Sequence, residues 1–168
     1  QFRIIGPELA SDGSQVYAFD FRGFGNSQEE KLPRGDTRDF KRHLQDIDDT
    51  IGYTRSNHPS KKIYMLGFSA GGLYTLWYAA NHPDSVDGLV LAAPAVVVGT
   101  THTRRASIQL FFANFFAPRM MYEFFNSSFV FAGGRDPEEV KIELEDPLET
   151  TKFSIRYLAN FKKPLRDK

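Results

Sequence analysis

The chain has 168 residues with 21 basic and 21 acidic side chains, so its formal net charge is zero. A composition of 41% apolar and 25% charged residues is typical of a globular protein and excludes an intrinsically disordered chain. Zero net charge gives no electrostatic reason to expect nucleic acid or an anionic membrane surface as a partner. The absence of cysteine excludes thiol catalysis, disulfides and thiolate-bound zinc or iron–sulfur centres.

The first residues and the apolar runs of the chain are relevant to whether it spans a membrane or carries a signal peptide. The longest apolar run, Leu89 to Val98, is far shorter than the ~20 residues of a membrane-spanning helix, and Pro94 interrupts it. No charged-then-apolar leader follows Gln1, so no signal peptide is visible. These features predict a cytoplasmic protein without a transmembrane segment. Because Gln1 leads almost at once into a helix-like stretch, we also expect an interior piece of a longer polypeptide.

The first half of the chain alternates between strand and helix patterns. Residues Phe2 to Ala10 predict one or two helical turns, and a turn cluster follows at Ser11 to Ser14. Val16 to Phe19 predicts a short buried strand that ends at Asp20. Phe21 to Ser27, with two glycines, predicts a tight loop.

A helix is expected next, with Asp36 as its N-cap. Its apolar face has spacings of four, three and four residues, at Phe40, Leu44, Ile47 and Ile51. Three further elements follow the same alternation: a buried strand, a helix that ends before Pro83, and a third strand, at Ile63–Leu66, Ala70–Asn81 and Leu89–Ala93.

This order of strands and helices predicts an α/β fold with a parallel sheet covered on both faces. The pattern changes from Thr100 onward. Strong strand signals end there, and helix-like periodicity appears in Ile108–Phe125 and Leu148–Phe161. We therefore predict a sheet core at 1–99 and a helical region at 100–168, with the boundary near Gly99.

The motif that carries chemistry is Gly67–Phe68–Ser69–Ala70–Gly71, which matches G-x-S-x-G. Such a pattern arises by chance in a glycine-rich chain, so its context decides. An apolar strand runs into Gly67 and a helix-compatible stretch leaves from Ala70, which is the strand–turn–helix of a nucleophile elbow. A sharp turn exposes the serine oxygen to a base and crowds its neighbours, so Gly67 and Gly71 are expected to provide the small residues.

Ala70 has a predicted role of its own. Its N–H lies at the positive end of the following helix, where it can stabilise the oxyanion of a tetrahedral intermediate. The competing interpretation is a glycine-rich turn with a bystander serine, and the flanking strand and helix argue against it.

Two nucleotide-binding motifs are excluded. After Gly23 and Gly25, the third glycine of G-x-G-x-x-G falls on Gln28, and no helix is expected to start there. No Gly-Lys-Ser/Thr follows any glycine cluster, so a phosphate loop is absent as well. No pair of histidines has metal-ligand spacing, and we expect neither a metal nor a cofactor.

Three segments of the chain resemble α/β-hydrolases. Residues 17–27 (YAFDFRGFGNS) are similar to their D-x-R-G-x-G-x-S segment, and residues 65–72 (MLGFSAGG) and 90–95 (VLAAPA) complete the similarity. The chain most resembles the group of monoacylglycerol lipases, lysophospholipases and serine aminopeptidases. This resemblance implies a partial α/β-hydrolase fold, with central parallel strands and crossover helices, followed by a helical cap. A stretch like Arg135–Val140 leading to Asp146–Leu148 belongs to that cap.

The resemblance also shows what is missing. In the family, a His-Gly loop before the first helix supplies a second oxyanion donor, and the acid and histidine follow later strands. The last histidine here, His102, precedes the cap. We therefore expect the acid and the histidine of the triad outside this chain.

The histidines within the chain are weaker candidates for the base. His58 and His82 each precede a proline at a helix end, and both are expected to be solvated loop residues. His43 is expected on the polar side of its helix, exposed to solvent. His102 follows the third strand at the edge where active sites gather, but nothing nearby orients it.

Two aspartates within the chain are candidates for the acid. Asp136 follows a strand-like stretch and superficially resembles the catalytic aspartate of the family, yet no histidine follows it. Asp20 resembles a structural turn residue of the family.

Phenylalanine is unusually frequent, and half of the sixteen fall between Phe111 and Phe131. An aromatic and methionine stripe predicts a cap helix that packs on the core. A second interpretation is an apolar wall that receives an acyl chain. The candidate substrate-binding residues are Phe111, Phe112, Phe115 and Phe116.

Together these features predict a serine hydrolase of carboxylic esters, with a small-molecule ester or lipid such as a monoacylglycerol or lysophospholipid as substrate. Ser69 would be the nucleophile and Ala70 the oxyanion donor. Two alternatives remain: a non-catalytic binding or interaction protein on the same fold, and another serine chemistry, such as peptidase or perhydrolase activity.

Overall fold

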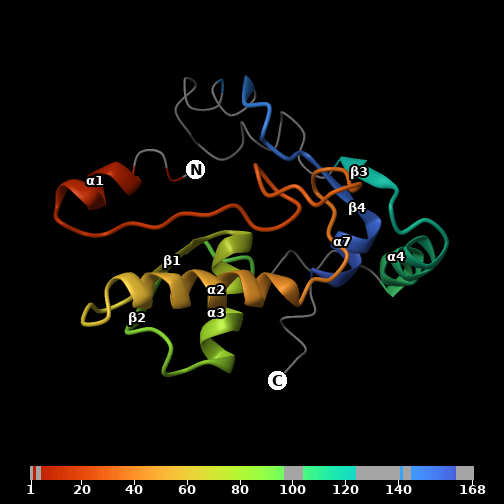
Figure 1. The fold of residues 1–168 in the computed structure, drawn as a ribbon. Helices are drawn as coiled ribbons and strands as arrows, with labels where there is room; N and C mark the ends of the chain where they lie inside the picture. The colour runs from red at the N-terminus through yellow and green to blue at the C-terminus, as the bar shows by residue number, and fades with distance from the viewer. Residues whose placement is uncertain (1, 3–4, 97–103, 124–140, 142–144, 162–168) are drawn as a thin grey trace.

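The computed structural model describes residues 2, 5–96, 104–123, 141 and 145–161 (Figure 1). Its helices and strands follow one another as α1 (Ile5–Ser11), α2 (Arg42–Asn57), β1 (Tyr64–Phe68), α3 (Ala70–Asn81), β2 (Gly88–Ala92), α4 (Arg104–Phe116), β3 (Met121–Glu123), β4 (Lys152–Ser154) and α7 (Ile155–Asn160).

Strands β1 and β2 form a parallel pair with α3 as the crossover between them. The register places Tyr64 opposite Gly88 and Phe68 opposite Ala92, so both strands end at the same edge. Helix α3 packs on both strands, and α2 packs on α3. The predicted α/β fold with a partial parallel sheet is thereby confirmed.

The apolar core lies between α2, α3 and α7. It consists of buried side chains that contact one another, namely Phe40, Ile47, Ile51, Ile63, Tyr74, Trp77, Tyr78 and Tyr157. The predicted apolar face of α2 is confirmed at Ile47 and Ile51, although Phe40 precedes the first residue of the helix.

The prediction for His43 is wrong, because its side chain is fully buried. His43, Ile47 and Ile51 are spaced by four residues, so they share one helix face. The imidazole packs against the rings of Phe21 and Tyr74, with centroids 5.1 and 4.9 Å away.

The predicted buried strand at Val16–Phe19 is also wrong. Residues 14–20 belong to no helix or strand, and Val16 and Phe19 are about 40% exposed. Tyr17 rests beside α2, since its ring meets Tyr53 and its hydroxyl lies 2.8 Å from Nε2 of His58. A strand needs a neighbour to pair its backbone groups, and no described strand lies against this segment.

After the core, the chain forms shorter elements than the periodicity predicts. Helix α4 ends at Phe116, two residues before Pro118, which cannot continue a helix. Strands β3 and β4 then pair antiparallel, although the sequence predicted no strand in this region. Three-residue strands are too short to leave an alternating pattern.

The predicted boundary near Gly99 lies outside the described residues, and the division into 1–99 and 100–168 stays a prediction. Helix α7 nevertheless contributes Tyr157 to the core cluster. No helix in the described ranges is long and apolar enough to cross a membrane.

Candidate active site

Ser69 occupies the turn between β1 and α3, with φ 50° and ψ −116°. A positive φ is strained for a residue with a side chain, so the surroundings must hold it. The Ser69 N–H donates to the carbonyl of Ala92 at 3.0 Å, and its carbonyl accepts from the N–H of Ala95 at 2.9 Å. The chain that leaves β2 therefore holds the serine backbone in place.

The turn requires small residues, but at a different position from the one predicted. A Cβ on Gly67 would lie 2.6 Å from Oγ1 of Thr75 and 2.7 Å from Cα of Gly72. A Cβ on Gly72 would lie 2.9 Å from Cβ of Pro94. By contrast, a Cβ on Gly71 would meet no described atom within 4 Å. The need for glycine at 67 agrees with the prediction, whereas among the described residues the second crowded position is 72 rather than 71.

Ser69 is also the N-cap of α3, yet its side chain makes no capping hydrogen bond. An N-cap serine usually accepts from the N–H two or three residues on, and the positive φ turns this side chain away from that role. The hydroxyl is thus left for other chemistry at the positive end of a helix.

Ala70 is the first residue of α3, so its N–H has no acceptor within the helix. Ser69 and Ala70 lie at the edge of the sheet where β1 and β2 end. This arrangement offers a donor next to the serine hydroxyl. The oxyanion role of Ala70 remains a prediction.

None of the three described histidines hydrogen-bonds to Ser69. His82 caps the C-terminus of α3, so a helix of 12 residues, about 18 Å long, separates it from the serine. It stacks on Tyr78 with ring centroids 4.3 Å apart. His58 pairs with Tyr17, and His43 is enclosed in the core. His102 and Asp136 lie outside the described residues.

Asp20 has a structural place in the loop after residue 19. Its Oδ2 accepts from the N–H of Asn26 at 2.9 Å. Gly25 has φ +48°, and a Cβ there would collide with the Asp20 carboxylate. This agrees with the prediction of a turn residue. No helix begins within residues 26–41. A dinucleotide-binding loop leads directly into a helix, so the loop at Gly23 and Gly25 lacks this feature.

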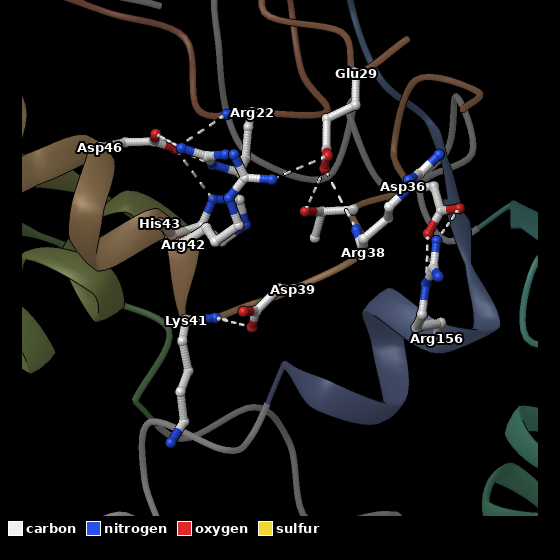
Figure 2. A network of polar contacts seen from close by, with 11 residues as sticks. Arg22, Glu29, Asp36, Arg38, Asp39, Lys41, Arg42, His43, Asp46 and Arg156 are labelled. Atoms are coloured by element: carbon white, nitrogen blue, oxygen red, sulfur yellow. Dashed lines mark hydrogen bonds and ion pairs between the residues drawn. The ribbon is translucent and has the colours of Figure 1, made fainter. Parts of the chain in front are cut away.

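A carboxylate–arginine pair supports the start of α2 (Figure 2). Arg22 forms a two-pronged ion pair with Asp46, and its Nε donates to Oδ2 at 2.9 Å. Nδ1 of His43 lies 3.8 Å from the same oxygen, too far for a strong hydrogen bond. Burial works to raise the pKa of Asp46, but the hydrogen bonds and positive charge of Arg22 outweigh it and hold that pKa below its usual range. The charges of Arg22 and Asp46 therefore neutralise each other in a structural ion pair.

Asp36 is not the N-cap of α2, contrary to prediction, because the helix begins six residues later at Arg42. Its carboxylate is fully buried and binds Ser154 and Arg156 instead. Figure 2 shows the contact with Arg156. The sequence gives no signal for this contact, since its partners are 118 and 120 residues away. The short carboxylate of Asp36, placed just before the apolar helix pattern, is equally consistent with an N-cap.

The phenylalanines of α4 are exposed rather than packed on the core. The exposed fractions run from 53% at Phe112 to 76% at Phe116. Adjacent rings meet edge to face in two pairs, Phe111 with Phe112 and Phe115 with Phe116. The prediction that this stripe mainly packs on the core is wrong for these four residues. Their role in substrate binding remains a prediction.

The chain is similar to one family of hydrolases and to several lipases. The model of the family described as serine aminopeptidase, S33, matches residues 2–166. A monoacylglycerol lipase of Mycolicibacterium smegmatis is 27% identical over 151 residues, which is 88% of this chain and 51% of the relative. A monoglyceride lipase of Mus musculus is 30% identical over 134 residues, or 79% of this chain and 42% of the relative.

A solved structure gives the same fold. The crystal structure of Paleococcus ferrophilus monoacylglycerol lipase superposes with a TM-score of 0.76 at 24% identity, covering 99% of this chain and 62% of that one. The chain spans about half the length of the curated relatives it matches. Since the family model covers nearly every residue, this chain belongs to the serine aminopeptidase S33 family of the α/β-hydrolase fold.

Proposed function

We propose that the whole protein is a serine hydrolase that cleaves carboxylic esters of lipid-like substrates. The observation that carries the proposal is Ser69, held at φ 50° between β1 and α3 with a side chain that caps nothing. A structural serine at a helix start normally makes the capping bond. Strain without a local benefit is typical of a functional position.

In this mechanism the Ser69 oxygen attacks the ester carbonyl and forms a tetrahedral intermediate. The Ala70 N–H donates to the oxyanion, helped by the field at the N-terminus of α3. Collapse of the intermediate expels the alcohol, which receives the former Ser69 proton from the base, and leaves an acyl group on Ser69 that water then hydrolyses. Pre-arranged donors matter because removing one typically costs about 10²–10³ in kcat.

The Ser69 proton must pass to a base. The three described histidines contact other groups, so they are not proposed for this role. We propose that a histidine and an acid in the remainder of the protein complete the triad, since the chain spans about half the length of its curated relatives. His102 with Asp136 is the alternative pair within the sequence.

A lipid substrate is favoured by two features. The relatives are named monoacylglycerol and monoglyceride lipases. The exposed phenylalanines of α4 offer apolar surface of the kind that an acyl chain needs. The family description favours a second candidate, hydrolysis of a peptide at its amino end by the same serine. No observation favours a purely binding role or perhydrolysis.

Labelling by a fluorophosphonate probe tests the proposal in the whole protein. Wild type is expected to be labelled and to hydrolyse a monoacylglycerol, and Ser69→Ala to lose both, with turnover falling by several orders of magnitude. Ser60→Ala, an exposed serine before β1, is the matched control and should retain both. Labelling that persists in Ser69→Ala refutes the nucleophile assignment. Turnover of an aminoacyl p-nitroanilide but of no ester supports the peptidase candidate instead.

A further inference from the structure

Asp36 joins two parts of the chain that lie far apart in sequence. Its Oδ1 accepts from the Ser154 hydroxyl at 2.6 Å and from Nε of Arg156 at 3.1 Å. Its Oδ2 accepts from Nη2 of Arg156 at 2.6 Å (Figure 2). The adjacent carbonyl of Gly35 accepts the N–H of Ser154 at 3.0 Å. The loop before α2 therefore holds the junction of β4 and α7 through side chains and backbone together.

The partners of Asp36 in turn hold the end of α4. The backbone N–H of Arg156 donates to the carbonyl of Pro118 at 2.8 Å, and that of Ile155 donates to Met120 at 2.9 Å. Pro118 lies two residues beyond the last residue of α4, and α4 packs on α7. Arg156 thus binds Asp36 through its guanidinium and the end of α4 through its backbone.

The same junction is tied to the helix that begins after Ser69. The Ser154 hydroxyl accepts the N–H of Tyr157 at 3.0 Å as the N-cap of α7. The hydroxyl of Tyr157 lies 2.7 Å from that of Tyr74 in α3. Helix α7 therefore contacts both the segment after α4 and the helix that begins after Ser69. Asp36 in turn binds the residues at the start of α7.

The chemistry of this contact favours a single geometry. A buried carboxylate is costly unless it is paired and hydrogen-bonded, and Asp36 accepts three hydrogen bonds from two side chains. The planar guanidinium of Arg156 binds both carboxylate oxygens, which restricts direction as well as distance. A point charge would hold α7 less specifically.

We propose that Asp36 is a positioning residue for acyl-chain recognition: through Arg156 and Ser154 it sets the place of α4, and with it the exposed phenylalanines, relative to Ser69. This inference rests on the proposed hydrolysis of lipid-like esters. A short ester reacts at Ser69 without contacting α4, whereas a long chain needs both sites at a fixed separation. Loss of Asp36 therefore selectively impairs long substrates.

The first test compares p-nitrophenyl esters of acetate and of a long acyl chain in the whole protein. In Asp36→Asn, an NH₂ group replaces one of the two oxygens that accept hydrogen bonds from Arg156. Two donors then face each other, so the two-pronged contact with Arg156 is lost. Its kcat/KM for the long ester is expected to fall by about tenfold or more, mainly through KM, with acetate changed by less than about threefold. The matched control Asp39→Asn, exposed in the same loop, should leave both values unchanged. Equal losses on both esters, or none, overturn the proposal.

The second test needs no activity, so it separates this inference from the proposed function. Backbone amides of α4 and β3 should exchange hydrogen at least about tenfold faster in Asp36→Asn than in wild type, with α3 and β1 unchanged. Unchanged exchange in α4, or equal acceleration in α3, overturns the positioning role. Arg156→Lys keeps the charge and provides a milder variant should Asp36→Asn fail to fold; it should shift both readouts in the same direction. Absence of ester turnover in wild type refutes the proposed function only.

Discussion

The hydroxyl oxygens of Tyr74 and Tyr157 lie 2.7 Å apart in the core, where both side chains are almost completely buried. This contact joins α3, which begins beside Ser69, to α7, which follows β4. Burial raises the pKa of both phenols, so each remains a neutral donor and acceptor. The pair is a polar contact inside a largely apolar cluster of aromatic and isoleucine side chains.

Replacing both tyrosines of this pair should cost less than the sum of the two single replacements. Tyr157→Phe leaves the Tyr74 hydroxyl buried without its partner, and we expect a loss of about 1–3 kcal/mol in the free energy of unfolding. The double change to phenylalanine should cost less than the sum of the single changes, since no polar group is left unpaired. Urea unfolding of the four proteins measures the coupling. Strict additivity contradicts a direct interaction.

The glycines of the serine turn are expected to differ sharply. Gly67→Ala places a Cβ against Thr75 and the backbone of Gly72, so either the turn shifts or the protein is destabilised by about 1–3 kcal/mol. Gly71→Ala has open space around its Cβ among the described residues, and alanine favours a helix, so its stability should be equal or slightly higher. Thermal unfolding with a fluorophosphonate labelling rate measures both effects. Equal damage from the two changes would contradict this packing.

The ion pair of Arg22 and Asp46 makes stability depend on pH. Because the folded pKa of Asp46 is lowered, the pair stabilises the native state above the unfolded pKa of about 3.9 and loses this contribution as pH falls through the folded pKa. Asp46→Asn should cost about 1.5–3 kcal/mol at pH 7. The gap from wild type should shrink progressively below about pH 4. Urea midpoints from pH 7 to pH 3 test this, and a constant gap would contradict it.

The exposed phenylalanines are expected to contribute to chain-length preference. Replacing Phe115 and Phe116 together by serine should weaken kcat/KM for long-chain esters much more than for acetyl esters. Each methylene that the wild type buries contributes about 0.8 kcal/mol, so the difference should grow with chain length until the apolar surface ends. A series of p-nitrophenyl esters measures the slope. The same loss at every length would mean that the rings only support the position of α4.

What the sequence predicted well is local. Helix α3 has the predicted bounds, because its start follows the glycine turn and its end precedes Pro83. Strands β1 and β2 lie within two residues of their predicted positions, since each is a short apolar run with a nearby break. The serine turn was recognised because its requirements fall within a few consecutive positions. The resemblance to the family rests on this stretch together with residues 17–27 and 90–95.

What the sequence did not predict depends on partners elsewhere. His43 has the polarity of a surface residue, but it shares the buried face of α2 with Ile47 and Ile51, and the rings of Phe21 and Tyr74 pack around it. Asp36 has the features of an N-cap, and its true partners are supplied by β4 and α7. The strand β4 exists only because β3 lies beside it. No local pattern encodes the partners of Asp36 or the pairing of β4 with β3.

The contact between Asp36 and Arg156 spans 120 residues of sequence, whereas β1, α3 and β2 lie within 29 consecutive positions, 64–92. Closing the longer loop costs more chain entropy, and its contacts are rewarded only after both ends are ordered. We therefore expect the strand–helix–strand unit around Ser69 to form first during folding. Docking of α7, and with it the end of α4, follows as a late step, so a variant at Asp36 should unfold faster while its early folding rate stays close to that of wild type.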